Sequence, residues 1–349
     1  MTRCESATDY SRAKDHVTGM DLEVIVFNYN YGSFLGEALA GIAAQTLRPT
    51  RTVVSDDCSP LDAMRDLQET ITAQLPAATL VQNPENLGAL EHYRKRTAEV
   101  SCDAYMVHSA DDLLTDKDFL RNAIEILEEN DDIIMVFGKY MNIDIDGNVC
   151  GVSSKQGWNI GRHIEGVDKM EGWSRIPGDV ARSYLFFDNV IPAICNVIRS
   201  SVHQSLPPFP IGNPHVHDWA QWFLMTYYGN FARIDRYVIN NRVHEESLSE
   251  TFERNNVAHL HYRDAYMDIL QRDEVEDSER CILENAMFAK EIEECSFSDF
   301  IKKSIPSILD RDKRSTLLQV LSTRIGRKMY HLSDNLSSAN KSKLISNIK

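Results

Sequence analysis

The fold class is decided by residues 23–59, which read EVIVFNYNYGSFLGEALAGIAAQTLRPTRTVVSDDCS. The run Glu23–Phe27 is short and apolar, as in a buried strand, and apolar residues from Phe34 to Ile42 then recur with helical spacing. A second apolar run follows at Thr52–Ser55. A strand, a helix and a strand in this order are typical of a parallel pair joined by a crossover helix.

The same alternation continues toward the C-terminus, and it predicts an α/β fold with a mostly parallel sheet flanked by helices. We expect further strands at 79–82, 104–108 and 133–137, and helices at 61–71, 87–99 and 119–127. Residues 139–215 are expected to form an irregular second half of the same domain. A helix at 216–229 and a strand at 231–240 are expected to follow.

From Asn255 onward only helical spacing recurs, so we expect a helical C-terminal extension. The predicted organisation is a flexible leader at 1–20, a catalytic α/β domain at 21–254, the extension at 255–332 and a loose basic tail at 333–349. The first twenty residues are polar and lack the apolar stretch of a signal peptide. No run of about 18 apolar residues predicts a membrane span.

Composition excludes several classes of function. The 349 residues are 43% hydrophobic and 26% charged, which is ordinary for a soluble globular protein. The formal net charge of −15 argues against general nucleic-acid binding, which needs clustered Lys and Arg. Seven scattered cysteines without a Cys-x-x-Cys pair argue against a disulfide framework or a zinc ribbon, and they favour a reducing, cytoplasmic location.

Polar residues follow three of the predicted strands. Asn28 follows the first, Asp56 and Asp57 the second, and Asp111 and Asp112 the fourth. Ligands of open α/β sheets bind beyond the carboxyl ends of strands, so these side chains are expected at one crevice. Adjacent carboxylates repel each other unless a cation or hydrogen bonds offset them, and oxygen ligands favour Mg²⁺ or Mn²⁺. The alternative is that these residues only start turns and cap helices.

No phosphate-binding Gly-x-x-x-x-Gly-Lys-Ser/Thr loop and no Gly-x-Gly-x-x-Gly follows the first strand. Instead, seven short motifs occur in order over about residues 21–250, and together they resemble glycosyltransferase family 2 on a GT-A fold. The first is a strand–helix unit with Asn28–Asn30, Phe34–Leu35 and Gln45–Thr46, and the others are Val53–Ser59, Asn86–Gly88, Ser109–Asp112, Met141–Gly147, His217–Trp222 and Arg242–Ser249.

The sequence departs from the family pattern at three motifs. Ser109 stands where the family has the first Asp of Asp-x-Asp, which leaves Asp111 as the metal ligand that the resemblance implies. His217 replaces the usual Glu before the catalytic base. Glu91–Arg94 stands where the family has Ala-Arg-Asn, and this departure affects the donor contacts.

The resemblance implies inverting transfer of a hexosyl or deoxyhexosyl group from a nucleotide-sugar, with Mn²⁺ or Mg²⁺ held by Asp111 and His244. Asp218 would act as the general base, and an alternative is that it only stabilises the start of a helix. The donor residues would be Phe27, Asn28, Asp56, Asp57, Asn86, Gly88 and Asp112. The acceptor residues would be His217, Trp219 and Trp222, although core packing is the commoner fate of such tryptophans.

The implied acceptor is a glycan or a lipid-linked glycan, as in bacterial-type surface polysaccharide or O-antigen synthesis. Nine basic and two acidic residues fall between Arg311 and Lys349, and the spacing of Leu317, Leu321 and Ile325 marks an apolar helix face. Such a helix can lie on the inner face of an anionic membrane, or it can pack on the catalytic domain or on a second subunit. The alternative function is a catalytically inactive GT-A protein that binds a nucleotide or a glycan.

Overall fold

The computed structural model describes residues 19–151, 167–186, 189–206, 216–245, 247, 258–277, 279–280, 283–284 and 287. The predicted leader up to residue 18, the apolar helix face from Leu317 and the basic tail lie outside the described residues.

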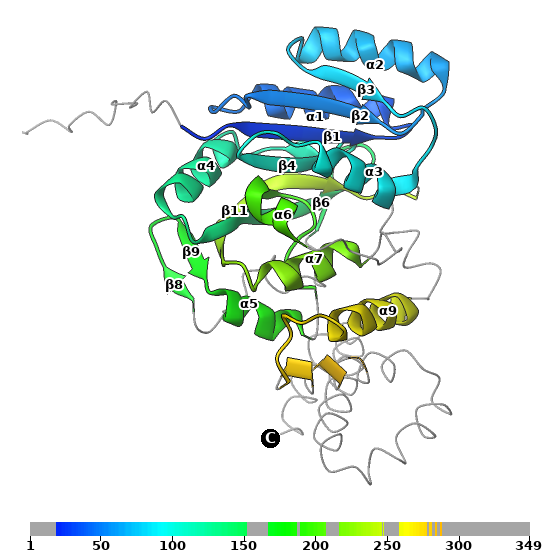
Figure 1. Cartoon of the computed structure of the whole chain (residues 1–349). Helices are drawn as coiled ribbons and strands as arrows, with labels where there is room; N and C mark the ends of the chain where they lie inside the picture. The colour runs from blue at the N-terminus through cyan, green and yellow to red at the C-terminus, as the bar shows by residue number, and fades with distance from the viewer. Residues whose placement is uncertain are drawn as a thin grey trace, which may run out of the picture.

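The described strands form one eleven-stranded sheet, in the order β3-β2-β1-β4-β10-β6-β11-β9-β8, with β5 beside β11 and β7 beside β6 (Figure 1). The strands are β1 Leu22–Asn28, β2 Arg51–Asp56, β3 Thr79–Gln82, β4 Ala104–Ser109, β5 Leu113–Leu114, β6 Ile133–Ile143, β7 Val149–Gly151, β8 Asp168–Lys169, β9 Trp173–Ile176, β10 Asn196–Arg199 and β11 Asn230–Arg242. The first four neighbours, β3 to β4, are all parallel, which confirms the parallel sheet predicted from the strand–helix alternation.

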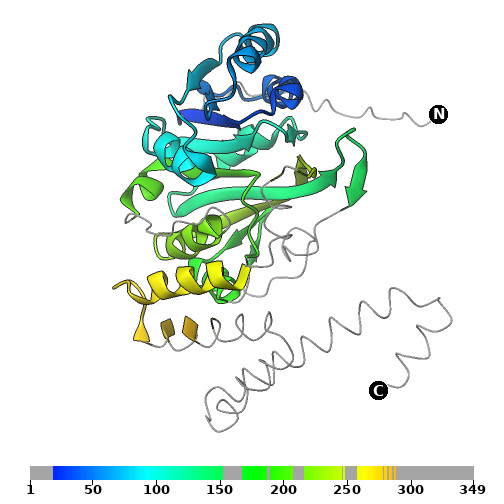
Figure 2. The same cartoon turned by 90° about the vertical axis from the view of Figure 1, so that its right-hand side faces the viewer.

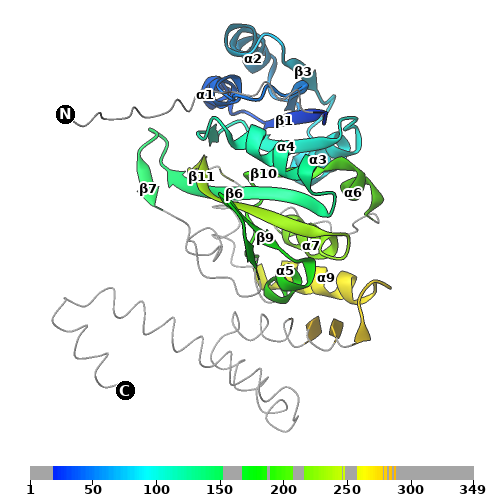
Figure 3. The same ribbon diagram turned by 90° about the vertical axis from the view of Figure 1, so that its left-hand side faces the viewer.

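The second half of the sheet is mixed. β10 lies antiparallel between β4 and β6, and β9 lies antiparallel to β11 (Figure 3). β6 extends beyond the predicted end at residue 137, where Tyr140 and Ile143 are also buried, and it then pairs with β7. The stretch expected to be irregular therefore contributes a central strand, β10, whose residues Val197 and Ile198 are fully buried.

Helices cover both faces of the sheet. They are α1 Gly32–Ala43, α2 Leu61–Gln74, α3 Gly88–Ala98, α4 Phe119–Glu129, α5 Gly178–Leu185, α6 Ser200–Ser205, α7 His217–Met225 and α9 Ala258–Leu270. Apolar residues of α1, α2 and α4 pack on one face, and those of α5, α7 and α9 on the other. Alternation along β1 supplies both cores, because Val24 and Val26 point to the first and Ile25 to the second.

Helix α9 belongs to the packed body of the domain. It lies beside α7, as the yellow helix in Figure 2 shows. The Tyr266 ring lies 4.8 Å from that of Trp219 in α7, and its hydroxyl donates to the carbonyl of Phe186. The extension predicted from residue 255 thus begins with a helix that packs on the α/β domain, while the boundary at 254 stays a prediction. Within the part of the chain described, no helix combines the length and apolarity needed to cross a membrane.

Candidate active site

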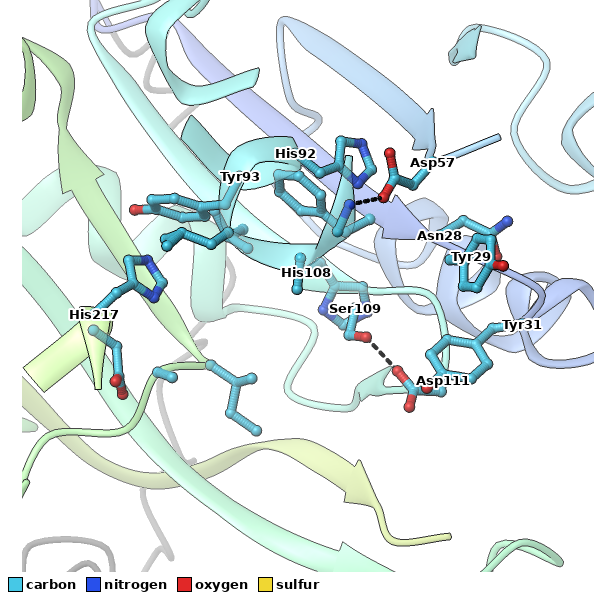
Figure 4. A pocket seen from close by; sticks show the side chains of 18 of the residues that line it. Asn28, Tyr29, Tyr31, Asp57, His92, Tyr93, His108, Ser109, Asp111 and His217 are labelled. Carbon is cyan, nitrogen blue, oxygen red and sulfur yellow. Dashed lines mark hydrogen bonds between the residues drawn. The ribbon is translucent and has the colours of Figure 1, made fainter. Parts of the chain in front are cut away.

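A cavity of about 520 Å³ opens beyond the carboxyl ends of β1 and β4, within the range of volumes typical of ligand sites. Figure 4 shows Asp57 and Asp111 on one side of it and His217 on the other. The lining residues are Phe27, Asn28, Tyr29, Tyr31, Asp57, Asn86, Gly88, Ala89, Leu90, His92, Tyr93, Val107, His108, Ser109, Asp111, Ala193, Ile194, Asn196, His217, Asp218 and Trp222.

The two aspartates at the end of β2 have different surroundings. Asp56 is completely buried and does not line the cavity, and its carboxylate accepts bonds from Asn28, Gln82 and both the backbone and the hydroxyl of Ser59. These contacts tie the ends of β1, β2 and β3 together. Asp56 therefore stabilises the turn that presents Asp57.

Asp57 lines the cavity and holds the loop before α3. Its Oδ1 accepts a bond from Asn83 Nδ2 at 2.8 Å and one from Leu87 N at 3.0 Å, and its Oδ2 accepts one from Gly88 N at 2.9 Å. Gly88 has φ +76°, a conformation that suits glycine because it lacks a Cβ. The Asn-x-Gly motif thus turns its backbone N–H groups toward Asp57, and Asn86 and Gly88 reach the cavity rim.

The aspartates at the end of β4 also differ. Asp112 is buried behind the cavity wall, and burial, followed by the charge of Asp111, raises its pKa well above the usual range. It accepts the backbone N–H of Arg242 at 3.0 Å. Asp111 lines the cavity, where it accepts the hydroxyl of Ser109, and its Oδ2 lies 3.0 Å from His244 Nε2. The structure therefore brings the two predicted metal ligands together.

Arg242 holds this pair in place, and the site predictions missed it. Its side chain is buried, and its Nε donates to the carbonyl of Asp111 at 3.0 Å. The rest of its guanidinium bonds to the carbonyls of Asp144 and Ile145 and to Glu37 of α1. Its position two residues before His244 on an extended segment was the available signal, because alternate residues share one face.

Asp218 lies at the opposite end of the cavity, in the first turn of α7. Its Oδ2 accepts one bond from Asn189 Nδ2, at 2.7 Å. Burial raises its pKa to about 6, against a usual value near 3.8. Asp218 is therefore ionised at neutral pH but is more basic than an exposed aspartate.

Aromatic side chains join the two ends of the cavity. The Phe27 ring meets the His92 ring edge-on at 4.7 Å and stacks with Tyr93 at 6.2 Å, and Tyr93 in turn meets the His217 ring at 4.6 Å. His92 Nε2 lies 2.6 Å from Ser55 Oγ. His92 and Tyr93 stand at the motif that departs from the family pattern, and sequence reasoning did not identify them as site residues.

The comparisons with known proteins agree with this arrangement. Residues 23–185 match the family model described as Glycosyl transferase family 2. The match covers every strand end that supplies Asp57, Asp111 and the loop at Gly88, and it ends before Asp218 and His244.

Solved glycosyltransferases share the fold. The crystal structure of S. aureus TarS 1–349 has a TM-score of 0.55 and 15% identity, covering 88% of this chain and 80% of that chain. The structure of TarS 1–349 in complex with UDP-GlcNAc has a TM-score of 0.55 and 16% identity, and the match covers 88% of this chain and 81% of that chain. The mannosyltransferase PcManGT from Pyrobaculum calidifontis, in complex with GDP-Man and Mn²⁺, has a TM-score of 0.51 and 15% identity. This match covers 93% of this chain and 92% of that chain. No curated protein matches.

The α/β domain therefore has the GT-A fold, and the two tryptophans that were predicted to contact the acceptor lie in different places. Trp219 is completely buried in the core, where its Nε1 donates to the carbonyl of Leu185 at 2.8 Å, so core packing is its role. Trp222, one turn later, lines the cavity beside Asp218. His217 lines the cavity as well, next to Tyr93.

Asp111 and His244 are of the side-chain types that bind divalent cations. Among the described residues no group of three or more His, Cys, Asp and Glu side chains could hold a metal ion. Asp111 and His244 would supply one oxygen and one nitrogen ligand, and each side chain is 8% exposed. Such a two-residue site leaves most coordination positions for phosphate oxygens and water, as Mg²⁺ sites with phosphate substrates do.

Proposed function

We propose that this protein is a metal-dependent, inverting glycosyltransferase that moves a hexosyl or deoxyhexosyl group from a nucleotide-sugar to an acceptor hydroxyl. The observation that carries the proposal is the cavity itself. Asp111, which is bonded to His244, and the basic carboxylate of Asp218 line it at opposite ends, although β4 and α7, which position them, are far apart in the chain.

The charge of the cavity supports the metal dependence. Its described lining contains three aspartates and no lysine or arginine. Burial lowers the pKa of His92 and takes that of His108 to about 4, so both rings are neutral at pH 7. A nucleoside diphosphate is an anion and would be repelled by this lining, whereas the same diphosphate with a divalent cation would not.

The residues divide the reaction between the two ends. Asp111 and His244 would hold Mn²⁺ or Mg²⁺, which when bound stabilises the charge that develops on the leaving diphosphate. Asp218 accepts the proton of the acceptor hydroxyl as its oxygen attacks the anomeric carbon. Attack from the side opposite the leaving group inverts the configuration, and Asn189 keeps the Asp218 carboxylate in one orientation.

The experiment that tests the proposal is calorimetric titration with UDP-, dTDP- and GDP-sugars, first with Mn²⁺ and then with EDTA. We expect one class of donor to bind with Mn²⁺ and to lose affinity with EDTA and in Asp111→Asn. Release of nucleoside diphosphate on adding an acceptor glycan completes the assignment. Binding without turnover for every acceptor would favour the inactive nucleotide-binding protein instead, and no binding of a folded protein would contradict both.

We also propose that the acceptor is a glycan or a lipid-linked glycan and that the protein acts in the cytoplasm, at the inner face of a membrane. The support is compositional, from the nine basic residues between Arg311 and Lys349. Deleting residues 311–349 is expected to abolish binding to anionic liposomes. Equal binding of the shortened and full chains would contradict the membrane proposal.

A further inference from the structure

We propose that Tyr93 is a positioning residue, which holds the first turn of α7 so that Asp218 stands at a fixed place in the cavity. This inference rests on the proposed function, in which Asp218 is the general base, and it gives a role to a residue that the proposed function leaves out. Tyr93 lies in the stretch 91–94, where the sequence departs from the family pattern.

Tyr93 contacts α7 on both sides of Asp218. Its ring meets the His217 ring edge-on, with centroids 4.6 Å apart, and its hydroxyl donates to Gln221 Oε1 at 3.0 Å. His217 directly precedes Asp218, and Gln221 follows it within one helical turn. Figure 4 shows the side chains of Tyr93 and His217 next to each other at this end of the cavity. The two contacts therefore bracket the backbone that carries the Asp218 carboxylate.

The Tyr93 hydroxyl is itself held by a buried network. It lies 3.4 Å from the hydroxyl of Tyr105 in β4, which in turn lies 2.8 Å from Nδ1 of His203 in α6. Tyr105 is completely buried and Gln221 is 5% exposed, so these bonds are shielded from water. The network joins α3, β4, α6 and α7, and Tyr93 is the member that lines the cavity.

Tyr93 supports the base without exchanging a proton with it. Burial raises the pKa of Tyr93, and it raises that of Tyr105 well above the usual range, so both hydroxyls stay protonated at neutral pH. Among the described contacts, the hydrogen bonds to the Asp218 carboxylate come from Asn189 and Trp219. Tyr93 therefore acts on Asp218 through the backbone of α7.

The helix that carries Tyr93 also reaches the donor end of the cavity. α3 begins at Gly88, whose N–H donates to Asp57 at 2.9 Å. The Tyr93 ring stacks with the Phe27 ring of β1 at 6.2 Å. α3 is thus fixed to the strand ends and to α7, so it sets how far Asp218 stands from the donor. Rates depend on such placement, since a misplacement of about 1 Å can lower a rate about 100-fold.

The first test compares Tyr93→Phe with the unaltered chain, with Mn²⁺ and with UDP-glucose, dTDP-glucose and GDP-mannose as donor probes. Phenylalanine keeps the ring and removes only the hydroxyl. We expect the release of nucleoside diphosphate, to water or to the acceptor glycan, to slow about 5–50-fold, while the calorimetric affinity for the donor changes less than about twofold. Loss of affinity at an unchanged rate, or no loss of rate, would overturn the inference.

Tyr227→Phe is the matched control. It removes a tyrosine hydroxyl just beyond the other end of α7, where the hydroxyl donates to Glu279 at 2.6 Å. Both variants lose a hydrogen bond of a tyrosine, but only Tyr93→Phe frees the first turn of α7. Tyr227→Phe should therefore leave the rate and the donor affinity unchanged, and equal losses of rate in the two variants would contradict the positioning role.

A second arm repeats Tyr93→Phe in the Asp218→Asn background. If Tyr93 acts by placing the base, its loss should lower the residual rate less than about twofold when the base is already absent. A merely structural role would lower the rate by the same factor in both backgrounds. Gln221→Leu removes the acceptor of the Tyr93 hydroxyl and should reproduce Tyr93→Phe, and the double variant should lose no more than either single variant.

Hydrogen exchange gives a readout that needs no turnover. Tyr93→Phe should speed deuterium uptake at residues 217–221 at least about threefold and leave uptake in α9 unchanged, because only the first turn of α7 loses its support. Unchanged uptake at 217–221 would overturn the inference at any level of activity.

The outcomes separate the positioning role from the proposed function. If the unaltered protein releases diphosphate and Tyr93→Phe does so equally fast, only the positioning role fails. If the unaltered, folded protein binds none of the donors with Mn²⁺, the proposed function fails, and hydrogen exchange still decides whether Tyr93 holds α7.

Discussion

The two ends of the cavity place their carboxylates in different surroundings. At the strand ends, Asp57 accepts three hydrogen bonds from the protein, and Asp111 is bonded to Ser109 and His244. At the start of α7, Asp218 accepts hydrogen bonds from the side chain of Asn189 and the backbone of Trp219, but its burial outweighs them and raises its pKa to about 6.

The surroundings of each carboxylate fit a different chemical role. A carboxylate that several neighbouring groups fix in position suits a receptor for a base or a metal ion. A carboxylate whose burial outweighs its hydrogen bonds has a raised pKa and is a stronger proton acceptor, which suits a general base. If the two ends act separately, a substitution at one end should leave the role of the other end unchanged.

The largest effect is expected from Asp218→Asn. Loss of the general base should lower the rate of transfer by about 10²–10⁴-fold, while the affinity for the nucleotide with Mn²⁺ changes less than about twofold. Steady-state release of nucleoside diphosphate and calorimetry measure the two quantities on the same preparation. A matched loss of rate and affinity would contradict the division of the cavity into two ends.

The same substitution should stabilise the fold at neutral pH. Because the pKa of Asp218 in the folded chain, about 6, lies above its usual value near 3.8, the folded chain binds more protons between these values. The free energy of unfolding therefore falls as pH rises through this window. Asp218→Asn removes the cost of ionising this buried carboxyl group. The substitution should therefore raise the free energy of unfolding by about 1–3 kcal/mol at pH 7.5, with a smaller increase at pH 4. Urea unfolding at both pH values measures it.

An intermediate effect is expected when the two aspartates after β4 are changed separately. Asp111→Asn should weaken Mn²⁺-dependent nucleotide binding by about 10–100-fold, the range that even outer-shell changes at metal sites can reach. Asp112→Asn is the matched control, because the amide keeps an oxygen for the N–H of Arg242 and mimics the neutral acid that its raised pKa favours. It should change affinity less than about threefold. Equal losses in both variants would show that the pair acts as one unit.

The smallest effect is expected from Asn189→Leu, which removes the only side-chain donor bonded to the Asp218 carboxylate among the described contacts. Loss of a hydrogen bond to a charged group should raise the pKa of Asp218 by about one to two units. The rate of transfer should then fall near pH 7 and recover at higher pH, which a pH–rate profile detects. A purely structural role would lower the rate equally at all pH values.

Much of the fold followed from local patterns. The alternation of apolar runs and helical spacing up to residue 137 predicted the parallel half of the sheet, because buried strands and amphipathic helices have different periods. β10 was missed, since a four-residue antiparallel strand between two parallel groups has no distinctive pattern of its own. Its place depends on β4 and β6, which are distant in the chain.

The sequence by itself determined the strand–helix order, the ordered motifs and the positions of the polar residues at strand ends. These features depend on neighbours in the chain. Only the tertiary structure decided that Asp57 and Asp111 line the cavity while Asp56 and Asp112 hold the backbone behind it. It also decided that Trp222 reaches the cavity and Trp219 the core. Adjacent residues point in different directions, and which direction faces the cavity is set by elements that meet only in the folded chain.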